Sequence, residues 1–202
     1  MSFPAELSDG AAVSSGVENG GPQRYACELT LDPNTVNNAL VLSEGNRKVT
    51  GVGESQSYPD HPDRFDNWND QVLCKESLTG QCYWEAQWSG HVYIAVSYKS
   101  IKRKGGVHPC WFGQNKKSWS LECSDHSFTV WHDNNPISIS VPSDSSKTVG
   151  VFVDESIGSL SFYSVSATHE LTHLHTFNTI FTDTLYAGFT AHAGSSVTLC
   201  HV

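Results

Sequence analysis

The sequence has little charge, few basic residues and only one methionine. Of its 202 residues 16% are charged, with 12 Lys and Arg against 21 Asp and Glu, which gives a formal net charge of −9. Nucleic-acid binders and proteins that dock on anionic membranes need a surplus of Lys and Arg, so the charge argues against both as partners. An aromatic content of 11% combined with so little charge also argues against a disordered chain or a coiled coil.

Long hydrophobic runs and paired cysteines are missing as well. No stretch approaches the roughly 18 apolar residues of a membrane span, and the first residues lack the basic and apolar segments of a secretory signal. The cysteines are scattered and no two form a CxxC pair. Without a secretory signal, we expect free thiols in a reducing, cytoplasmic compartment, and a disulfide framework is the less favoured alternative. The six are Cys27, Cys74, Cys82, Cys110, Cys123 and Cys200.

Residues 1–24 are rich in Gly, Ser, Ala and Glu and show no periodicity. Such a segment buries too little apolar surface to offset its ordering entropy, so we expect a disordered lead or linker. The folded domain is then predicted to span residues 25–202.

Short runs of alternating apolar and polar residues fill that domain. In residues 82–89, for example, Trp84, Ala86 and Trp88 share one face. Alternation with period two predicts strands with one buried and one solvated face. Turn signals such as Ser89-Gly90 separate the runs, and no helical stripe is convincing. We therefore predict an all-β, two-sheet antiparallel, jelly-roll-like sandwich with little helix.

The longest irregular stretch, about residues 53–71, carries four aspartates. Calcium sites use roughly six to eight oxygens at fixed positions, and this spacing matches no such pattern, so a solvated acidic loop is favoured. Tyr58, Phe65 and Trp68 are the aromatic residues available to pin it. The aspartates are Asp60, Asp63, Asp66 and Asp70.

No catalytic or metal-binding pattern emerges. His173 and His175 share a strand face, and Cys110, Cys123 and His126 lie near one another in sequence, but neither group has the paired spacing of a zinc site. The nucleophile elbow G-x-S-x-G and a phosphate-binding glycine loop are both missing from the sequence. We predict no catalytic residue, no metal and no cofactor.

Two features suggest contacts with a partner. Lys99, Lys102, Arg103 and Lys104 form the one basic cluster, which either steers an acidic partner or simply solvates a loop. Trp131 falls on the face opposite to its buried neighbours, where an exposed aromatic residue favours an interface; burial under a loop is an equal alternative.

Several stretches, in order, resemble the PRY-SPRY (B30.2) domain family. Leu31-Asp32-Pro33 resembles the PRY opening. Residues 61–88 resemble the family's RFD…QVLC…YWEVE block, with Ala86 in place of the usual Val, and residues 149–165 resemble a diverged copy of its L-D-Y-E-A-G-x-x-S-F-Y motif. The resemblance covers residues 28–202, and the wording is most similar to fish tripartite-motif (TRIM) proteins, NOD-like receptors and stonustoxin-type toxin subunits. Its structural signature residues are Leu31, Asp32, Pro33, Trp84, Glu85, Asp154, Gly158, Phe162 and Tyr163.

The resemblance implies a PRY part at about residues 25–75 and a SPRY part at about residues 76–202. It also implies a module that binds a protein or peptide through variable loops, in innate-immune or ubiquitin-related scaffolding. Carried onto this chain by motif order, the expected partner-binding residues are Asp66, Trp68, Asp70, Lys102, Arg103, Lys104, His126, Trp131, Asp133, Asn134 and His192.

Domains that would give other activities are not seen in the sequence. A RING-type ubiquitin ligase activity needs a Cys/His pattern that this chain lacks, so we expect no enzyme. Two alternatives remain: the C-terminal module of a secreted cytolytic toxin subunit, and a lectin-like glycan binder. The sequence leaves the partner and the oligomeric state open.

Overall fold

The computed structural model describes residues 20–202, and most of the predicted disordered lead lies outside them. Within these residues the regular secondary structure is nearly all strand, which confirms the predicted all-β sandwich. Helix in residues 20–202 is confined to a 3-10 turn, η1 (Pro22–Tyr25), and a single turn of α-helix, α1 (Val107–Cys110). No helix in residues 20–202 has the length and apolar character needed to cross a membrane.

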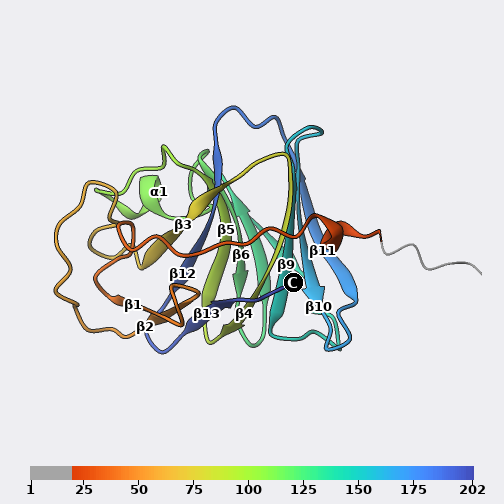
Figure 1. Cartoon of the computed structure of the whole chain (residues 1–202), viewed down its shortest axis with the longest axis horizontal. Helices are drawn as coiled ribbons and strands as arrows, with labels where there is room; N and C mark the ends of the chain where they lie inside the picture. Colours follow the sequence, from red (N-terminus) through yellow and green to blue (C-terminus); the bar gives the residue numbers. More distant parts are fainter. Residues whose placement is uncertain (1–19) are drawn as a thin grey trace, which may run out of the picture.

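Thirteen strands form two antiparallel sheets, which overlap in Figure 1. The seven-stranded sheet has the order β1-β2-β13-β4-β9-β10-β11, and the six-stranded sheet the order β3-β12-β5-β6-β7-β8. The strands of the first sheet are β1 (Leu40–Ser43), β2 (Lys48–Gly51), β4 (Gln81–Ser89), β9 (Thr148–Asp154), β10 (Ser159–Val165), β11 (Leu171–Asn178) and β13 (Ser196–Leu199). Those of the second are β3 (Gln71–Leu78), β5 (Val92–Tyr98), β6 (Ser118–Cys123), β7 (Phe128–His132), β8 (Asn135–Ile139) and β12 (Leu185–Ala191).

Side chains from the facing sides of the two sheets form the core. Trp84 of β4 packs edge-on against Phe189 of β12 at 5.6 Å between ring centroids, and Trp88 of β4 packs against Phe128 of β7 at 6.1 Å. The predicted inward set Trp84, Ala86 and Trp88 is fully buried, which confirms the period-two reading of this strand.

The expectation of one solvated face per strand is wrong for β4 and β5. Tyr83 and Glu85 lie on the second face of β4 yet are buried, and the Tyr83 hydroxyl donates to Glu85 at 2.6 Å. On β5 all seven residues are buried. The second face of β5 is covered by a small cluster outside the six-stranded sheet, to which Phe65 and Phe112 belong. Loops from elsewhere in the chain supply this cover, which strand periodicity does not report.

The N-terminal part of the domain corrects two predictions. Residues 22–25, split by the predicted boundary at 24, form η1 (Pro22–Tyr25). The following chain lies against β4, where Cys27 N–H donates to the Tyr83 carbonyl at 2.9 Å. Cys27 and Cys82 are joined by a disulfide, so the expectation that every cysteine is a free thiol is wrong for this pair. The sequence gives no hint of it because the partners are 55 residues apart.

Several of the residues that carry the family resemblance lie in the core or close a turn. Leu31, Trp84 and Phe162 are buried in the core. Asp154 closes the β9–β10 turn by accepting bonds from the Ser156 backbone and hydroxyl, and these bonds, led by the hydroxyl, hold the pKa of Asp154 below its usual value.

Candidate partner-binding surface

Six side chains gather at the end of the six-stranded sheet where β5 begins and β6 ends, on the face of the sheet that points away from the core. They come from five segments between positions 91 and 192, because β12 lies between β3 and β5 and brings the end of the chain beside its middle. Tyr93 of β5 stands opposite Glu122 of β6 on one side and Thr190 of β12 on the other. We call this set the aromatic patch: His91, Tyr93, Trp111, Glu122, Trp131 and His192.

Glu122 links the patch. Its Oε1 lies 2.7 Å from His91 Nε2, and its Oε2 accepts a hydrogen bond from Trp131 Nε1 at 2.8 Å. Burial raises the pKa of Glu122, but the hydrogen bonds from His91, Trp131 and Tyr93 outweigh it, so the pKa lies below its usual value. The carboxylate is therefore ionised at neutral pH and orients two rings.

The remaining rings pack against one another beside this carboxylate. His192 lies 4.5 Å from His91 and 5.7 Å from Trp111 between ring centroids, and Tyr93 meets Trp111 edge-on at 5.6 Å. Burial, and then the nearby His91, lower the pKa of His192, while Glu122 opposes the shift. The lowered pKa keeps His192 mainly neutral at neutral pH, so its ring nitrogens can both donate and accept hydrogen bonds.

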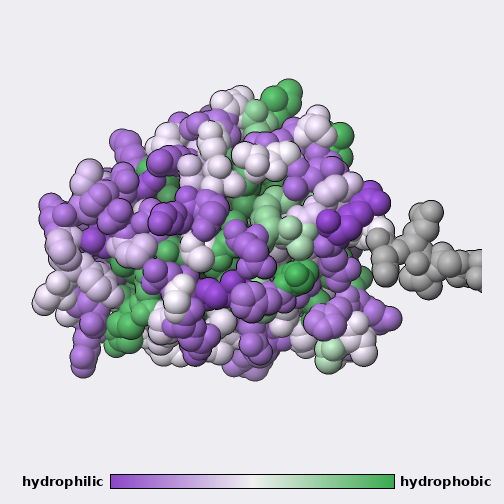
Figure 2. Space-filling model, viewed as in Figure 1, coloured by the Kyte–Doolittle hydropathy of each residue, from purple (hydrophilic) through white to green (hydrophobic). Residues whose placement is uncertain are grey.

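A groove adjoins the patch. It lies between residues 37–39 and the loop 53–70 and encloses about 720 Å³. In Figure 1 this loop forms the left-hand edge of the molecule, and in Figure 2 the same region is largely hydrophilic. Ala191 N–H donates to the Asp70 carbonyl at 3.2 Å, which joins the groove to the segment that carries His192.

The loop that forms the groove is held by one buried arginine. Arg64 donates to the carbonyls of Pro59, Pro33 and Val36 at 2.9 to 3.1 Å. Phe65 is also buried, as predicted for a pinning residue, whereas Trp68 is 82% exposed and pins nothing. The loop therefore has a fixed backbone and one free indole.

The structure brings several predicted contact residues together. Trp131 and His192 lie in the aromatic patch, and Asp66, Trp68, Asp70 and Lys104 line the groove. Asp133 and Asn134 form the exposed β7–β8 turn next to Trp131; their backbone N–H groups donate to the carbonyls of Asn115 and Gly113.

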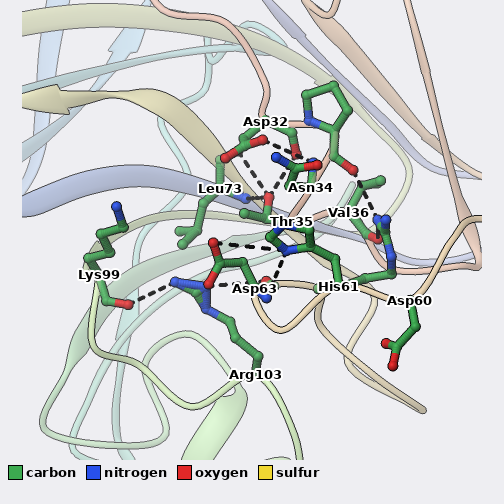
Figure 3. Close-up of polar contacts among 12 residues, drawn as sticks. Asp32, Asn34, Thr35, Val36, Asp60, His61, Asp63, Leu73, Lys99 and Arg103 are labelled. Atoms are coloured by element: carbon green, nitrogen blue, oxygen red, sulfur yellow. Dashed lines mark hydrogen bonds and ion pairs between the residues drawn. The ribbon is translucent and has the colours of Figure 1, made fainter.

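Other predicted contact residues lie apart. Lys102 is exposed on the loop after β5, and His126 is exposed on the β6–β7 turn. Arg103 is buried instead of presenting its charge: it donates to the carbonyls of Lys99 and Asp63, and Figure 3 shows its side chain turned toward both residues. The guanidinium carbon of Arg103 also lies 5.2 Å from the centroid of the Phe65 ring, so this side chain packs inward and does not face solvent.

Four residues of the patch are not among those predicted from the sequence: His91, Tyr93, Trp111 and Glu122. Tyr93 and Glu122 stand on the non-core faces of their strands, as Trp131 does, so the alternation that singled out Trp131 contains the signal for both. Nothing in the sequence places Trp111, because the single helical turn before it determines its position. Within residues 20–202 no three His, Cys, Asp or Glu side chains are placed to hold a metal ion.

Comparison with known proteins agrees with the geometry. The family model of PRY, the SPRY-associated domain, matches residues 29–78, and that of the SPRY domain matches residues 81–201. Stonustoxin subunit beta of Synanceia horrida is 42% identical over 168 residues, which is 83% of this chain and 24% of that protein. Tripartite motif-containing protein 16 of Mus musculus is 36% identical over 82% of this chain and 30% of its own length.

Solved structures give the same result. The stonustoxin structure superposes with a TM-score of 0.80 at 39% identity, covering 87% of this chain and 29% of that one. The crystal structure of the TRIM65 PSpry domain superposes with a TM-score of 0.79 at 31% identity and covers 90% and 93% of the two chains. The chain thus spans about a quarter to a third of the curated relatives named above and nearly all of one isolated domain.

Proposed function

The chain belongs to the SPRY domain family, with its associated PRY segment, and we propose that it binds a protein or peptide partner through the aromatic patch. SPRY domains are commonly protein-interaction modules and typically non-catalytic. The observation that carries the proposal is the convergence of three aromatic rings, two imidazoles and an oriented carboxylate from five segments at one end of the six-stranded sheet.

The chemistry of the patch suits an interface. His91, Trp131 and His192 are partly exposed and offer contact area to a partner, whereas Tyr93 and Trp111 are buried and pack against the two imidazoles. Tryptophan supplies a large contact area at small entropic cost and dominates binding energy where it lies near the centre of a contact. Glu122 holds Trp131 and His91 in place before any partner arrives, so little order has to be gained on binding. The polar ring edges supply hydrogen bonds that fix register.

Partner capture by matched variants tests the proposal. Trp131→Ala combined with His192→Ala alters the patch, whereas Ile157→Ala combined with Ile180→Ala alters two exposed side chains at the other ends of the strands. A protein that the wild type and the far-end variant retain, and that the patch variant loses while keeping its circular dichroism spectrum, supports the proposal. Retention by all three variants would place binding elsewhere.

The setting predicted from sequence is cytoplasmic, in innate-immune or ubiquitin-linked scaffolding. The TRIM relatives favour that setting, because one of them is described as an E3 ubiquitin-protein ligase. Any ligase activity would belong to other domains, since this chain matches only part of those proteins.

One observation favours the second candidate, a module of a secreted toxin-like subunit. Disulfides form and persist mainly in oxidising compartments, and Cys27 and Cys82 are linked. Several relatives at about 40% identity are toxin subunits. Trapping thiols in the producing cell before lysis separates the settings: a protected Cys27–Cys82 pair supports secretion, and alkylated Cys27 and Cys82 support the cytoplasm.

A further inference from the structure

The groove beside the aromatic patch has an exposed indole on its rim. Trp68 is 82% exposed, and it follows Asn67, whose backbone adopts a left-handed conformation with φ of 47° that Asn tolerates better than most residues. The Asp70 N–H donates to the Trp68 carbonyl at 3.1 Å, which closes a tight turn between the two residues. This turn places an indole and a carboxylate two residues apart beside the same groove.

The positive charges of the groove are already engaged. Arg64 donates its hydrogen bonds to backbone carbonyls, and Lys104 forms an ion pair with Asp60 at 3.2 Å. Two carboxylates that line the groove, Asp66 and Asp70, have no ion-pair partner among residues 20–202. Carbonyl acceptors do not cancel the charge of Arg64, so the lining sums to two cations, Arg64 and Lys104, against three carboxylates, those of Asp60, Asp66 and Asp70, and its formal net charge is −1.

Of the carboxylates of Asp66 and Asp70, that of Asp70 has fewer hydrogen-bond partners among the described residues. Asp66 accepts bonds from the side-chain amides of Asn67 and Asn69, whereas no donor reaches the Asp70 carboxylate within the described part of the chain. Asp70 is half-buried, and burial raises its pKa. A cation in the groove would offset this cost, and no Lys, Arg or His among residues 20–202 forms an ion pair with Asp70.

We propose that the groove binds an arginine side chain of the partner, with the guanidinium stacked on the Trp68 indole and paired with the Asp70 carboxylate. The inference rests on the proposed function and names the chemical group that this part of the surface selects. Arginine fits better than lysine because its planar guanidinium stacks on an aromatic face while it donates to a carboxylate in its own plane. The groove is connected to the segment that carries His192 by the hydrogen bond from Ala191 N–H to the Asp70 carbonyl.

A titration with two small peptides tests the groove alone. Acetyl-Gly-Arg-Gly-amide is compared with the same peptide carrying citrulline, which keeps the shape but removes the charge, and the indole N–H resonances of the tryptophans report binding. We expect a saturable shift of the Trp68 resonance, assigned with Trp68→Leu, and an affinity about fivefold weaker for the citrulline peptide.

Matched variants decide whether Asp70 is responsible. Asp70→Asn should weaken the arginine peptide by a similar factor, whereas Asp144→Asn removes an exposed acid of a distant loop and should leave affinity unchanged. Equal affinity for both peptides, or arginine binding that survives Asp70→Asn, would overturn the inference. Because the peptides do not need the patch, failure of this titration is distinguishable from failure of partner capture by the patch variants.

Discussion

Glu122 and Asp70 are both half-buried carboxylates, but they differ in how many hydrogen bonds they receive. Burial raises the pKa of both, but Glu122 receives hydrogen bonds from His91, Trp131 and Tyr93, which bring its pKa below the usual value. Asp70 receives none from the described residues and keeps a raised pKa. The first carboxylate organises the free protein, and the second is left for a ligand to complete.

The lowered pKa of Glu122 predicts a pH dependence of stability. A carboxyl with a depressed folded pKa stabilises the fold above its ordinary value of 4.5 and loses that contribution as the pH falls through the folded pKa. Glu122→Gln should therefore flatten the fall in the free energy of unfolding between about pH 5 and pH 3. Urea unfolding at several pH values measures this, with Glu54→Gln, an exposed acid, as control. Parallel curves for wild type and Glu122→Gln would refute the assigned role.

Gly158 tests a backbone requirement in the β9–β10 turn. Its φ is +69°, and a Cβ there would meet the Thr179 carbonyl oxygen at a distance no real contact allows. Gly158→Ala should lower the free energy of unfolding by more than about 2 kcal/mol. Gly45→Ala has a similar φ of +66° but open space, and should cost only about 1 kcal/mol. Equal losses in thermal unfolding would mean that the close approach to Thr179 does not matter.

For single residues, the sequence predicts those whose position follows from their own strand or motif. Trp131 is predicted because it breaks the inward pattern of its own strand, and His192 by its place in the motif order. Arg103 is misjudged because a Lys/Arg cluster resembles a solvated loop until the fold packs one member over Phe65. Burial of a cation depends on carbonyls from distant segments, which composition does not reveal.

Among the elements, the loop 53–70 is the one that shapes the groove. It contains no regular secondary structure from residue 52 to 70, yet Arg64 fixes it through carbonyls on both sides and lies 5.3 Å from the Tyr58 ring. We therefore expect this long loop to keep one conformation and to form a stable side of the groove.

Arg64→Ala should loosen this loop. Three carbonyls would lose their donor inside the protein, and we expect a loss of about 3 kcal/mol in the free energy of unfolding. Thermolysin should then cleave within the loop much faster than in wild type, and the arginine peptide should no longer bind. Lys102→Ala, which removes an exposed cation of the next loop, is the control. Cleavage at the wild-type rate would show that the loop is held by other contacts.

The sequence predicts the N-terminal segment of the domain poorly. The prediction places the start of the domain at residue 25, but η1 begins at Pro22 and the disulfide joins Cys27 to β4. Strand alternation determines the thirteen-strand sandwich well, because each strand carries its own pattern. A covering segment with no pattern is found only when the surface it covers is known.

Removing the disulfide gives a direct test of that segment. Cys27→Ser combined with Cys82→Ser should lower the free energy of unfolding by about 2–4 kcal/mol relative to the oxidised protein. A reductant should destabilise the wild type and leave the double variant unchanged. Peptide mapping without reductant supplies the control, since it should find Cys27 linked to Cys82 and the other four cysteines free. Insensitivity of the wild type to reductant would contradict the assigned link.

For the whole molecule, the sandwich brings segments 100 residues apart onto one surface. The strand order β3-β12-β5-β6-β7 places His192 beside His91, and loop 53–70 continues the surface through Asp70. Resemblance to relatives predicts which loops take part. The network between Glu122 and its donors comes from the packing of three segments, the start of β5, β6 and β7, and is seen only in the structure.

Site-specific photo-cross-linking tests the central claim most directly. A benzoylphenylalanine at position 134, in the exposed turn beside Trp131, should form an adduct with the partner in cells that make the protein. The same group at position 157, at the other ends of the strands, should form none. Trp131→Ala should abolish the adduct at position 134. An adduct from position 157 alone, or one from position 134 that persists in Trp131→Ala, would contradict the account.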